Sequence, residues 1–421
     1  MNQQLPVIII GAGPVGLAAA AHLVEYKIPF KILEKGESVG SNILEWRHVQ
    51  LFSPWEYNID QAALQLLQKT DWQQPDIHKL PTGKDFIEEY LLPLSRLGVI
   101  HDNLQYNAEV IHVTKNGADK LKSDKRNERP FVVHYKNGSS LEKIKASAII
   151  DASGSWQNPN PPYADGVWLN NSLRDLVHTN IPNVYQQPEV FKERHTVVIG
   201  AGHSALNSLM NLAELKEAYP ATKISWVLRK ESALSAFGGG AQDQLEARGA
   251  LGTSVHKLVQ QGIVEVFTPF HVEDIHNDGI RFVLTSSEGT KLSVDEIIVN
   301  TGSRPNFDFL REVRYEIDPV VESTPTLAPL IDPNLHSCGT VRPHGEEELR
   351  HPEANFYTAG VKSYGRAPTF LMTTGYEQVR SIVAYIAGDV QAAKQVKLKL
   401  PETGVCKTTI LPQKQQDCCV N

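Results

Sequence analysis

The sequence predicts an α/β fold made of two nested nucleotide-binding domains, and three observations support this prediction. Residues 7–16 read VIIIGAGPVG, and residues 197–205 read VVIGAGHSA. In both, an apolar strand runs through a G-x-G-x-x-G/A turn into a helix of small residues. Two similar strand-turn segments, Ile149–Gly154 and Ile297–Pro305, bracket the second motif. The pattern therefore places one Rossmann-like unit inside another.

The first glycine-rich turn predicts a dinucleotide site. Its residues are Gly11, Gly13, Pro14 and Gly16. In such a turn the first glycine makes the bend, the second lets the backbone approach a pyrophosphate, and the third packs helix on strand. The N-terminus of the following helix then binds the anion.

The end of the next strand indicates which dinucleotide binds there. The strand expected over Pro29–Leu33 ends at Glu34, which Lys35 follows. A carboxylate at this place accepts the hydroxyls of an adenosine ribose, so we expect the first site to take FAD or NAD. The alternative for Glu34 is a solvated strand end.

The second turn predicts another dinucleotide site. Its residues are Gly200, Gly202, His203, Ser204 and Ala205. The next strand, Lys223–Leu228, ends at Arg229 and Lys230. Two cations there suit the 2′-phosphate of NADPH, which a carboxylate would repel. In the alternative interpretation they are an ordinary basic pair, and His203 merely starts the helix.

Length, charge and cysteine usage favour a protein of the cytoplasm. The chain has 421 residues, enough for two or three domains, and its net charge of −7 argues against nucleic acid as a partner. No apolar run approaches the roughly 20 residues of a membrane span. The run Val7–Ile10 leaves no room for a signal peptide before it. The four cysteines all lie beyond residue 337, which fits a cytoplasmic protein without a disulfide framework.

Helices and short strands are expected between the two turns. The helical stretches are Ile59–Lys69 and Gly83–Leu97, the second starting at Pro81 and Thr82. The strands are Glu109–Thr114, Pro130–Tyr135, Ser140–Ile144 and Ala148–Ile150, with a hairpin turn at Asn137-Gly138. The charged segment Asn116–Arg129 is expected to be an exposed, mobile loop.

The C-terminal part predicts a last strand, Asn355–Gly360, and a helix from Thr369 to Ala387 that ends at Gly388. The N-terminus of this helix is placed to point its N–H groups at an electron-rich ring. From Asp389 onward the chain loses periodicity. The expected domains are residues 1–155 and 297–395 for the outer domain, 156–296 for the inserted domain, and 396–421 for a tail.

Two nested nucleotide folds with these turns resemble the two-dinucleotide-binding flavoproteins, which include thioredoxin reductases, glutathione-reductase-like enzymes and flavin-dependent monooxygenases. Residues 46–54, WRHVQLFSP, and residues 152–161 are similar to segments of the small flavin-containing monooxygenases. More narrowly, residues 238–240, 247–252 and 362–368 resemble flavin-binding monooxygenases found in bacterial arsenic-resistance clusters. The resemblance covers nearly the whole chain up to Gly388.

The resemblance implies an NADPH domain inserted into a discontinuous FAD domain. It further implies that NADPH reduces FAD, and that a C4a-peroxyflavin then oxygenates a small soft nucleophile at sulfur, nitrogen or trivalent arsenic. The partners are then a small-molecule substrate and oxygen, with no nucleic acid and no membrane, and a homodimer is left open. Further cofactor contacts implied are Trp46, Ser153, Gly154, Thr301, Gly302 and Gly360.

Three groups are candidates for catalysis, because such a site needs cations or proton donors near the flavin. They are Arg47, His48 and Arg366. The alternative for Arg47 and His48 is a loop role, hydrogen-bonded to flavin phosphate or backbone. The alternative for Arg366 is a structural clamp before the last helix.

The chain also departs from these families. The reductases carry a redox cysteine pair beside the flavin, whereas the first cysteine here is Cys338. The glycine-aspartate pair that often follows the last flavin strand is absent, because Val361 and Lys362 follow Gly360. The F-x-G-x-x-x-H signature of flavin-containing monooxygenases is unmatched, and His178 lies in that interval at the wrong spacing.

The cysteines of the C-terminal tail leave other functions of the protein open. Cys406, Cys418 and Cys419 are soft ligands suited to a thiophilic metal or metalloid. The last two resemble the terminal cysteine pair of mercuric reductases, which allows a reductase whose tail carries electrons or a metalloid. A third hypothesis for the protein is a non-catalytic NADPH-bound redox sensor. For the tail itself, the alternative to a metalloid site is that its cysteines have no role.

Overall fold

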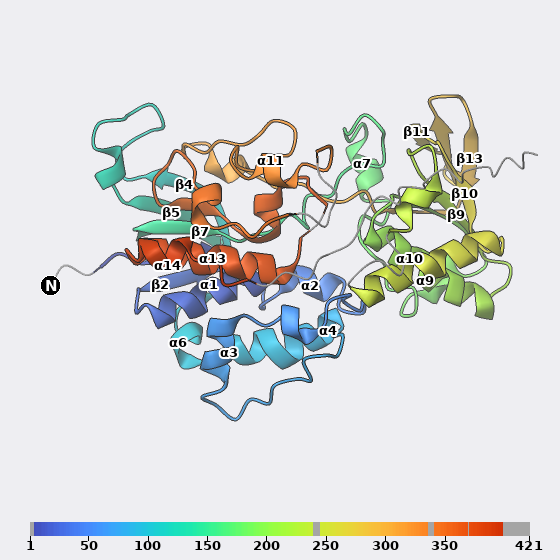
Figure 1. Cartoon of the computed structure of the whole chain (residues 1–421). Helices are drawn as coiled ribbons and strands as arrows, with labels where there is room; N and C mark the ends of the chain where they lie inside the picture. Colours follow the sequence, from blue (N-terminus) through green and yellow to red (C-terminus); the bar gives the residue numbers. More distant parts are fainter. Residues whose placement is uncertain (1–3, 239–244, 336–340, 369, 399–421) are drawn as a thin grey trace, which may run out of the picture.

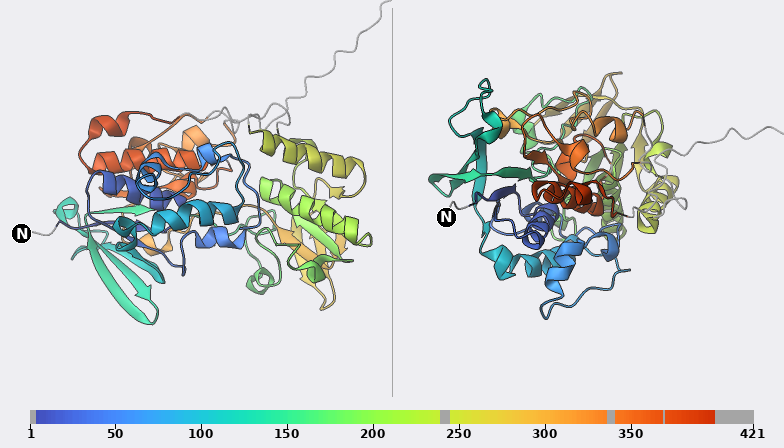
Figure 2. Two further views of the ribbon diagram at one scale, coloured as in Figure 1. Left: turned by 90° about the horizontal axis from the view of Figure 1, so that it is seen from below. Right: turned by 60° about the vertical axis from the view of Figure 1, so that its left-hand side comes forward.

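The structure is a computed structural model that describes residues 4–238, 245–335, 341–368 and 370–398. Its ribbon shows two lobes (Figure 1). The first lobe holds the N-terminal part of the chain and the last helices, and the second lobe is formed by the middle of the chain. Figure 2 shows the two lobes lying side by side, with the green and yellow second lobe at one end.

The first lobe is centred on a five-stranded parallel sheet with the strand order β15-β7-β1-β2-β3. A three-stranded antiparallel sheet, β4-β5-β6, lies beside it. The strands are β1 (Val7–Ile10), β2 (Phe30–Leu33), β3 (Leu104–Gln105), β4 (Ala108–Lys115), β5 (Phe131–Asn137), β6 (Ser140–Ala146), β7 (Ala148–Asp151) and β15 (Phe356–Thr358).

Helices cover the other face of the parallel sheet. The early ones are α1 (Pro14–Glu25), α2 (Ser41–Glu45), η1 (Trp55–Tyr57), α3 (Gln61–Leu67), α4 (Gly83–Asp85), the π-helical η2 (Phe86–Leu91), α5 (Leu92–Ser95) and α6 (Gly98–His101). The later ones are α11 (Ala328–Ile331), α12 (Glu346–Leu349), η7 (Gly360–Tyr364), α13 (Met372–Ile386) and α14 (Val390–Lys394). On the side of the antiparallel sheet, η6 (Asp308–Leu310) packs on β4, and η3 (Arg126–Glu128) lies in the connection between β4 and β5.

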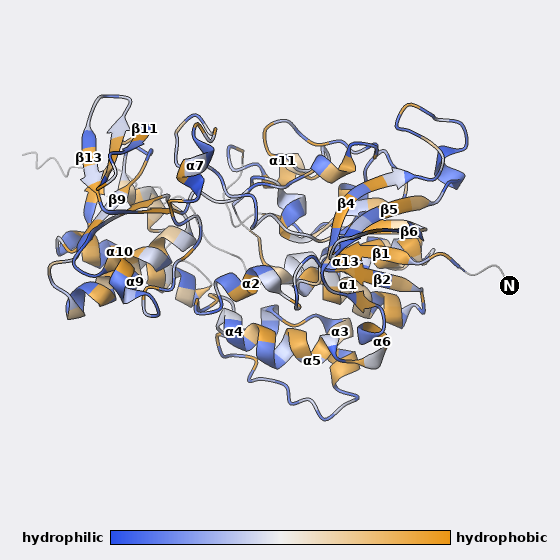
Figure 3. Ribbon diagram, turned by 180° about the vertical axis from the view of Figure 1, so that it is seen from behind, coloured by the Kyte–Doolittle hydropathy of each residue, from blue (hydrophilic) through white to orange (hydrophobic). Residues whose placement is uncertain are grey.

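The side chains of each strand point alternately to the two faces of the parallel sheet, and this divides the core of the first lobe into two layers. Val7 and Ile9 pack with α1 and α13, whereas Ile8 and Ile10 pack with β5 and the β4–β6 sheet. Successive side chains of a strand point to opposite faces, and both faces of a parallel sheet are covered. This is why β1 is a continuous apolar run. Figure 3 shows hydrophobic residues gathered on β1, β2, α1 and α13.

The second lobe repeats this plan. Its parallel sheet has the order β10-β9-β8-β14, and its antiparallel sheet is β11-β12-β13. The strands are β8 (His195–Ile199), β9 (Lys223–Val227), β10 (Glu265–Phe267), β11 (Val272–Asn277), β12 (Phe282–Ser286), β13 (Lys291–Val294) and β14 (Glu296–Val299). The helices are α7 (Asn171–Arg174), α8 (Pro188–Phe191), α9 (His203–Ala218), η4 (Ala233–Ala236) and α10 (Glu246–Gln260).

Two linkers between the lobes run antiparallel to each other. The first is residues 155–160 and the second is residues 301–304, and they meet in a bridge between Pro159 and Ser303. The N–H of Asn160 donates to the carbonyl of Gly302 at 2.9 Å, and the N–H of Arg304 donates to the carbonyl of Asn158 at 3.0 Å. The lobes are therefore joined by a short two-stranded ribbon.

Most of the expected elements are confirmed. β1 and the strand ends at Glu34 and Asp151 lie within one residue of their expected places. Thr82 caps its helix, and helical structure continues from Gly83 to Ser95. The Asn137-Gly138 hairpin joins β5 to β6, and Gly388 follows the last long helix with a positive φ.

Three expectations are corrected. The segment from Ile297 onward was expected to return to the first lobe, but β14 pairs in parallel with β8 and completes the second sheet. The segment Asn116–Arg129 is not simply exposed, because Arg126 is 3% exposed and forms an ion pair with Glu353 at 2.8 Å. The chain stays regular beyond Asp389, which caps α14 by accepting from the N–H of Ala392.

Within the described residues, no helix is long and apolar enough to cross a membrane. The Cys338, Cys406, Cys418 and Cys419 thiols lie outside the described residues, and so do Gly239, Gly240, Asp243 and Gln244 of the glycine-rich segment. The expected metalloid site of the tail therefore stays a prediction.

A buried ion pair fastens α3 to α1. The ring Nε2 of His22 lies 3.2 Å from Oδ2 of Asp60, and both side chains are nearly inaccessible to water. Asp60 also caps α3 by accepting from the N–H of Ala63, and its own N–H donates to the Tyr90 hydroxyl. Burial alone would lower the pKa of His22, but the charge and hydrogen bond of Asp60 outweigh it and raise the pKa to about 9.

This pair predicts a defined pH dependence of stability. Because the pKa of His22 is raised, its contribution is complete below the unfolded value near 6.5 and is lost as the pH rises through 9. His22→Leu should lower the free energy of unfolding at pH 6 by about 3–5 kcal/mol, since it leaves Asp60 unpaired. The difference from wild type should shrink at pH 10. Urea unfolding at both pH values measures it, and an equal difference at both would contradict the prediction. Glu25→Gln, which removes the exposed partner of the same ring, should cost about 1 kcal/mol or less.

Candidate functional site

The first glycine-rich turn is shaped by two close approaches and one open position. A Cβ on Gly11 would lie 2.9 Å from the carbonyl oxygen of Ala152, and a Cβ on Gly16 would lie 2.0 Å from that of Gly11. Gly11 also has a φ of +97°. Gly13 differs, because a Cβ there would meet no atom within 4 Å. Packing thus explains why glycine stands at positions 11 and 16. Gly13 instead faces free space, where the diphosphate of a dinucleotide would approach the protein backbone.

Glu34 holds the turn in place. Its Oε2 accepts from the N–H of Ala12 at 2.7 Å, and its Oε1 accepts from the N–H of Gly36 and the hydroxyl of Ser41 at 2.8 and 2.7 Å. A carboxylate offers about four acceptor positions, so one is left. Ser41 Oγ also lies 2.9 Å from the carbonyl of Ser38, which can accept its proton instead, so the expected contact of Glu34 with a ribose stays a prediction.

The N-terminus of α13 closes over the same turn. A Cβ on Gly375 would lie 2.5 Å from Cγ2 of Val15, and one on Gly360 would lie 3.2 Å from the same atom. The start of α1, the end of β15 and the first turn of α13 thus meet at one point. Gly360 has a φ of +71°, and its N–H donates to Oε1 of Gln378 in α13.

The helices that begin at this turn and at its counterpart have no side-chain cap. No side chain caps α1 at Gly13 or α9 at Gly202, and neither first turn contains an acid. Asp60, Thr82 and Asp389 cap α3, α4 and α14. Uncapped N–H groups and the helix dipole favour an anion at both places.

A buried ion pair joins the two segments that flank the first turn. Nζ of Lys362 in η7 lies 2.6 Å from Oδ2 of Asp151 at the end of β7, and the two side chains are 1% and 0% exposed. The same ammonium donates to Oγ of Ser153 at 3.1 Å, and it lies 4.6 Å from the ring of Phe309. Val361 stands where the aspartate of the glycine-aspartate pair would follow Gly360, and the charge of the next residue, Lys362, is neutralised by Asp151.

The second glycine-rich turn reproduces the geometry of the first. Gly200 has a φ of +135°, and a Cβ there would lie 2.1 Å from the carbonyl oxygen of Asn300. A Cβ on Gly202 would again meet no atom within 4 Å. Ala205 fills the third position and is fully buried. The first and third positions pack the turn, and the second faces free space.

The cations expected at the end of β9 are available for binding. Arg229 and Lys230 are exposed, and their side chains form no hydrogen bond or ion pair within the described part of the chain. They follow directly on Leu228, which is buried. An exposed basic pair at this strand end suits a 2′-phosphate.

The loop after α2 reaches from the first lobe to the second. Trp156 of the linker donates through Nε1 to Glu45 at 2.7 Å, and its ring lies 6.4 Å from that of Trp46. A Cβ on Gly83 would lie 3.0 Å from the Trp46 ring, so Trp46 is packed between α4 and the linker. Farther along, the ring of Phe52 lies 5.2 Å from that of His203, the first residue of α9.

His48 is held neutral at the junction of the lobes. Burial lowers the pKa of His48 below its ordinary value, and the nearby charge of Arg47 lowers it further, against a hydrogen bond to the backbone of Pro182. Its Nε2 is buried and has no hydrogen-bond partner among the described residues. A buried ring nitrogen without a partner is a mark of a functional group or an absent ligand.

The other candidate residues have simpler surroundings. Arg47 and Arg366 are exposed, and their side chains form no hydrogen bond or ion pair within residues 4–398 as far as these are described. The backbone N–H of Arg366 donates to the carbonyl of Val321 at 2.6 Å. Lys35 is exposed and forms an ion pair with Glu109 at 2.7 Å, which gives it a partner other than a cofactor.

Three of the expected cofactor contacts, Thr301, Gly302 and Gly154, lie in or next to the two linkers. Oγ1 of Thr301 donates to the carbonyl of Asn160 at 2.9 Å, and Gly302 has a φ of +84°. Gly154, at the other linker, has a φ of +75°. Among the described residues, no group of three or more His, Cys, Asp or Glu is arranged to hold a metal ion.

Sequence reasoning missed the roles of Asp151, Lys362 and Phe52. A charged residue at the end of an apolar strand was the available signal for Asp151. For Lys362 the signal was a charged residue two positions after Gly360, at the end of the last strand. For Phe52 there was none, because its contact depends on how the lobes meet.

The family model of the pyridine nucleotide-disulphide oxidoreductases matches residues 8–337, and the chain belongs to this family. An uncharacterised CzcO-like oxidoreductase of Geobacillus kaustophilus is 25% identical over 334 residues, which cover 74% of this chain and 84% of the relative. The flavin-containing monooxygenase FMO GS-OX-like 9 of Arabidopsis thaliana is 23% identical over 375 residues, which cover 81% of this chain and 72% of the relative.

Solved structures share the fold with both reductases and monooxygenases. The bacillithiol disulfide reductase Bdr of Bacillus cereus has a TM-score of 0.66 at 21% identity, covering 92% of this chain and 99% of that chain. The FAD-bound cadaverine monooxygenase DfoA of Erwinia amylovora has a TM-score of 0.63 at 14% identity, covering 95% and 100%. The expected resemblance to two-dinucleotide-binding flavoproteins is confirmed, and these likenesses show the fold alone.

The glycine geometry predicts separate effects of two similar substitutions. Gly13 has an ordinary φ of −79° and free space around it, so Gly13→Ala should fold and weaken FAD binding by roughly tenfold or more, because its methyl enters the ligand space. Gly16→Ala should destabilise the protein even without FAD, because its methyl meets the Gly11 carbonyl. Flavin fluorescence titration and thermal unfolding of the apoprotein measure both. FAD affinity of Gly13→Ala equal to wild type would show that the first turn is not the site.

Proposed function

We propose that this protein is an FAD-dependent, NADPH-oxidising monooxygenase that acts on a small soft nucleophile. The observation that carries the proposal is the pair of glycine turns, each with an open second position and an uncapped helix start, in a chain with no cysteine before residue 338. Two dinucleotides can bind, and electrons have no dithiol in the usual place to go to.

FAD is assigned to the first turn. Its diphosphate would lie against Gly13 and the start of α1, and a ribose hydroxyl would take the remaining acceptor position of Glu34. The uncapped N-terminus of α13 faces the same region, where its N–H groups would favour the electron-rich end of the flavin ring. FAD, when bound, supplies the chemistry of accepting a hydride and activating oxygen.

NADPH is assigned to the second turn. Gly202 and the start of α9 would take its diphosphate, and Arg229 and Lys230 would take the 2′-phosphate. The likeness of this turn to the first in backbone shape supports a second dinucleotide of the same kind. The loop that carries Trp46 and Phe52 lies between the two turns, where the reacting rings would have to meet.

His48 is the candidate for handling a proton at this junction. Its ring is neutral at pH 7, because burial lowers its pKa, and Nδ1 or Nε2 can therefore accept as well as donate. The backbone of Pro182 orients the ring, and Nε2 is buried without a hydrogen-bond partner among the described residues. Arg47 adds an exposed positive charge beside it.

The reaction follows from the two cofactors and oxygen. NADPH gives two electrons, one oxygen atom is transferred to the soft atom of the substrate, and the other leaves as water with the protons from NADPH and solvent. Sulfur, nitrogen and trivalent arsenic are the substrate atoms that the proposal covers. The similar disulfide reductase supports the competing reading, in which the electrons pass to a disulfide and oxygen is not consumed.

Labelled oxygen distinguishes the two readings. Purified protein is incubated with NADPH, ¹⁸O₂ and, in turn, a thioether, an amine and arsenite. We expect one ¹⁸O atom in the product of at least one substrate class for each NADPH oxidised, as measured by mass spectrometry. NADPH oxidation that needs a disulfide and not oxygen would make the protein a reductase. Hydrogen peroxide as the sole product with all three substrates would make it an oxidase. Gly202→Ala, with its ordinary φ of −89°, is the folded control that should not turn over.

The basic pair predicts a preference for NADPH. Arg229→Gln with Lys230→Gln should lower the ratio of kcat/KM for NADPH over NADH by roughly tenfold or more, because a charge-assisted contact to the 2′-phosphate is lost. Turnover with NADH should stay near wild type. Lys223→Gln, which removes an exposed charge from the other end of β9, is the matched control. An unchanged ratio in the double variant would place the 2′-phosphate elsewhere.

A further inference from the structure

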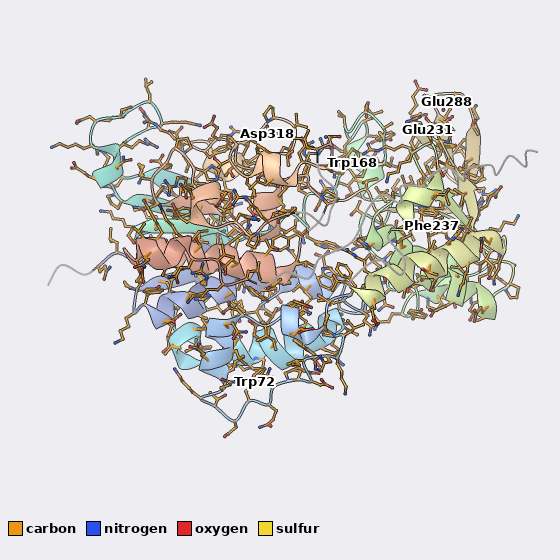
Figure 4. All side chains as sticks on the ribbon, in the orientation of Figure 1. Trp72, Trp168, Glu231, Phe237, Glu288 and Asp318 are labelled. Carbon is orange, nitrogen blue, oxygen red and sulfur yellow. The ribbon has the colours of Figure 1, made fainter. Side chains whose placement is uncertain are left out.

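A buried hydrogen-bond network holds the first lobe together where β15, η7 and α13 meet. The backbone N–H of Gly360 donates to Oε1 of Gln378 at 2.8 Å, and Nε2 of Gln378 lies 2.9 Å from Nε2 of His344. Nδ1 of His344 lies 3.2 Å from the carbonyl oxygen of Arg342. Gln378 and His344 are 0% and 3% exposed. Figure 4 shows side chains crowded around α13 in this lobe.

The backbone groups at the two ends of this network fix the direction of every hydrogen bond in it. A backbone N–H can only donate, so the amide oxygen of Gln378 faces Gly360 and the amide NH₂ group faces His344. A backbone carbonyl can only accept, so the proton of the His344 ring lies on Nδ1 and points at Arg342. Nε2 of His344 is then the acceptor for Gln378. The network is therefore satisfied by a neutral His344 ring.

A further bond from Gln378 blocks the alternative arrangement of its amide. Nε2 of Gln378 also donates to Oγ of Ser363 at 2.9 Å, and that hydroxyl donates to the carbonyl of Gly360 at 2.7 Å. A proton added to Nε2 of His344 would put two donors face to face. Turning the amide to relieve this would oppose its NH₂ group to the N–H of Gly360. Protonation of His344 therefore displaces the Gly360 backbone or leaves buried donors without partners.

The electrostatic surroundings also favour the neutral ring. Burial lowers the pKa of His344 below its ordinary value, against the hydrogen bond to the Arg342 backbone. The charged groups near the ring are Arg342 on its own segment, Glu348 in α12 and Glu377 in α13. Each of the two acids already has an arginine partner, at 3.1 and 2.7 Å. From η7 the ring meets the neutral side chain of Tyr364, whose centre lies 5.6 Å away.

The network is connected to the first glycine-rich turn through Gly360. A Cβ on Gly360 would lie 3.2 Å from Cγ2 of Val15, and a Cβ on Gly375 in α13 would lie 2.5 Å from the same atom. Val15 belongs to the first turn of α1, next to the open position at Gly13. A shift of the Gly360 backbone therefore acts directly on the helix start that we assign to FAD.

We propose that His344 is a positioning residue for FAD, because its neutral ring orients the Gln378 amide that holds Gly360 against the start of α1, and that protonation of this ring weakens FAD binding. The proposal rests on the assignment of FAD to the first turn, and it adds a dependence of that site on pH. FAD affinity is then constant above the pKa of His344 and falls below it, by at most about tenfold for each pH unit. Because burial places this pKa below 6.5, the decline lies on the acid side of neutrality.

Fluorescence titration of FAD into the full-length apoprotein, from pH 7.5 to pH 4.5, tests the proposal without turnover. His344→Gln can still accept from Gln378 through its amide oxygen but cannot take up a proton. It should bind FAD within about threefold of wild type at pH 7.5 and lose the decline in acid. His344→Leu cannot accept, so it should bind FAD roughly fivefold or more weakly than wild type at pH 7.5.

A second buried histidine of the same lobe provides the matched control. The ring of His351 accepts from the N–H of Glu316 and lies 3.2 Å from the hydroxyl of Thr358. His351→Gln removes this titrating ring and leaves the network of Gly360 in place. It should keep the wild-type decline of FAD affinity between pH 7.5 and pH 5. Circular dichroism at each pH confirms that the compared proteins are folded.

The outcomes separate this inference from the proposed function. If wild type binds no FAD at pH 7.5, the assignment of the first turn is wrong and the inference fails with it. If wild type binds FAD equally well across the range, or if His344→Gln keeps the wild-type decline, only the inference is wrong. Should His344→Gln not fold, Gln378→Met replaces it, because a thioether cannot relay the protonation of His344 to Gly360. FAD binding without a decline in Gln378→Met would support the inference, and a wild-type decline would overturn it.

Discussion

The close contact of the first glycine of each turn with the end of a neighbouring strand is the constraint on which both lobes depend. In the first lobe the Cβ position of Gly11 lies 2.9 Å from the carbonyl oxygen of Ala152, and in the second that of Gly200 lies 2.1 Å from the carbonyl oxygen of Asn300. No side chain fits at either contact. The helix can therefore begin directly at the carboxyl edge of the sheet, where its free N–H groups face outward. The open positions at Gly13 and Gly202 follow from the same geometry.

Buried charged side chains hold together the segments around the first glycine-rich turn. The Lys362–Asp151 pair ties the end of β15 to the end of β7, and Glu34 ties the end of β2 to the turn. Each of these groups costs free energy to bury and is stabilised only by its partners. The segments they join are far apart in the sequence and adjacent in the sheet.

The sequence was informative where local rules determine structure. Parallel strands buried on two faces are read directly from apolar runs, and glycine turns from their spacing, so β1, the two turns and the caps at Thr82 and Gly388 could be predicted. It was uninformative where a side chain finds a partner in another segment. The burial of Arg126 against Glu353, the pairing of β14 with β8, and the contact of Phe52 with Arg248 depend on long-range packing. The hydrogen bonds of Glu34 to Ala12, Gly36 and Ser41 were unforeseen for the same reason, and its contact with a ribose stays a prediction.

The paired linkers determine how the lobes can move. A single strand between two lobes would allow swivelling about its own axis. Here residues 155–160 and 301–304 are hydrogen-bonded side by side, and Oγ of Ser155 lies 2.9 Å from Oγ of Ser303. Such a ribbon resists torsion and shear but still bends across its width. Motion between the lobes is thereby reduced to one main degree of freedom, and every opening moves Phe52 away from α9 and α10 together. A hydride donor held on one lobe and its acceptor held on the other would then approach along a fixed path, whichever substrate waits between them.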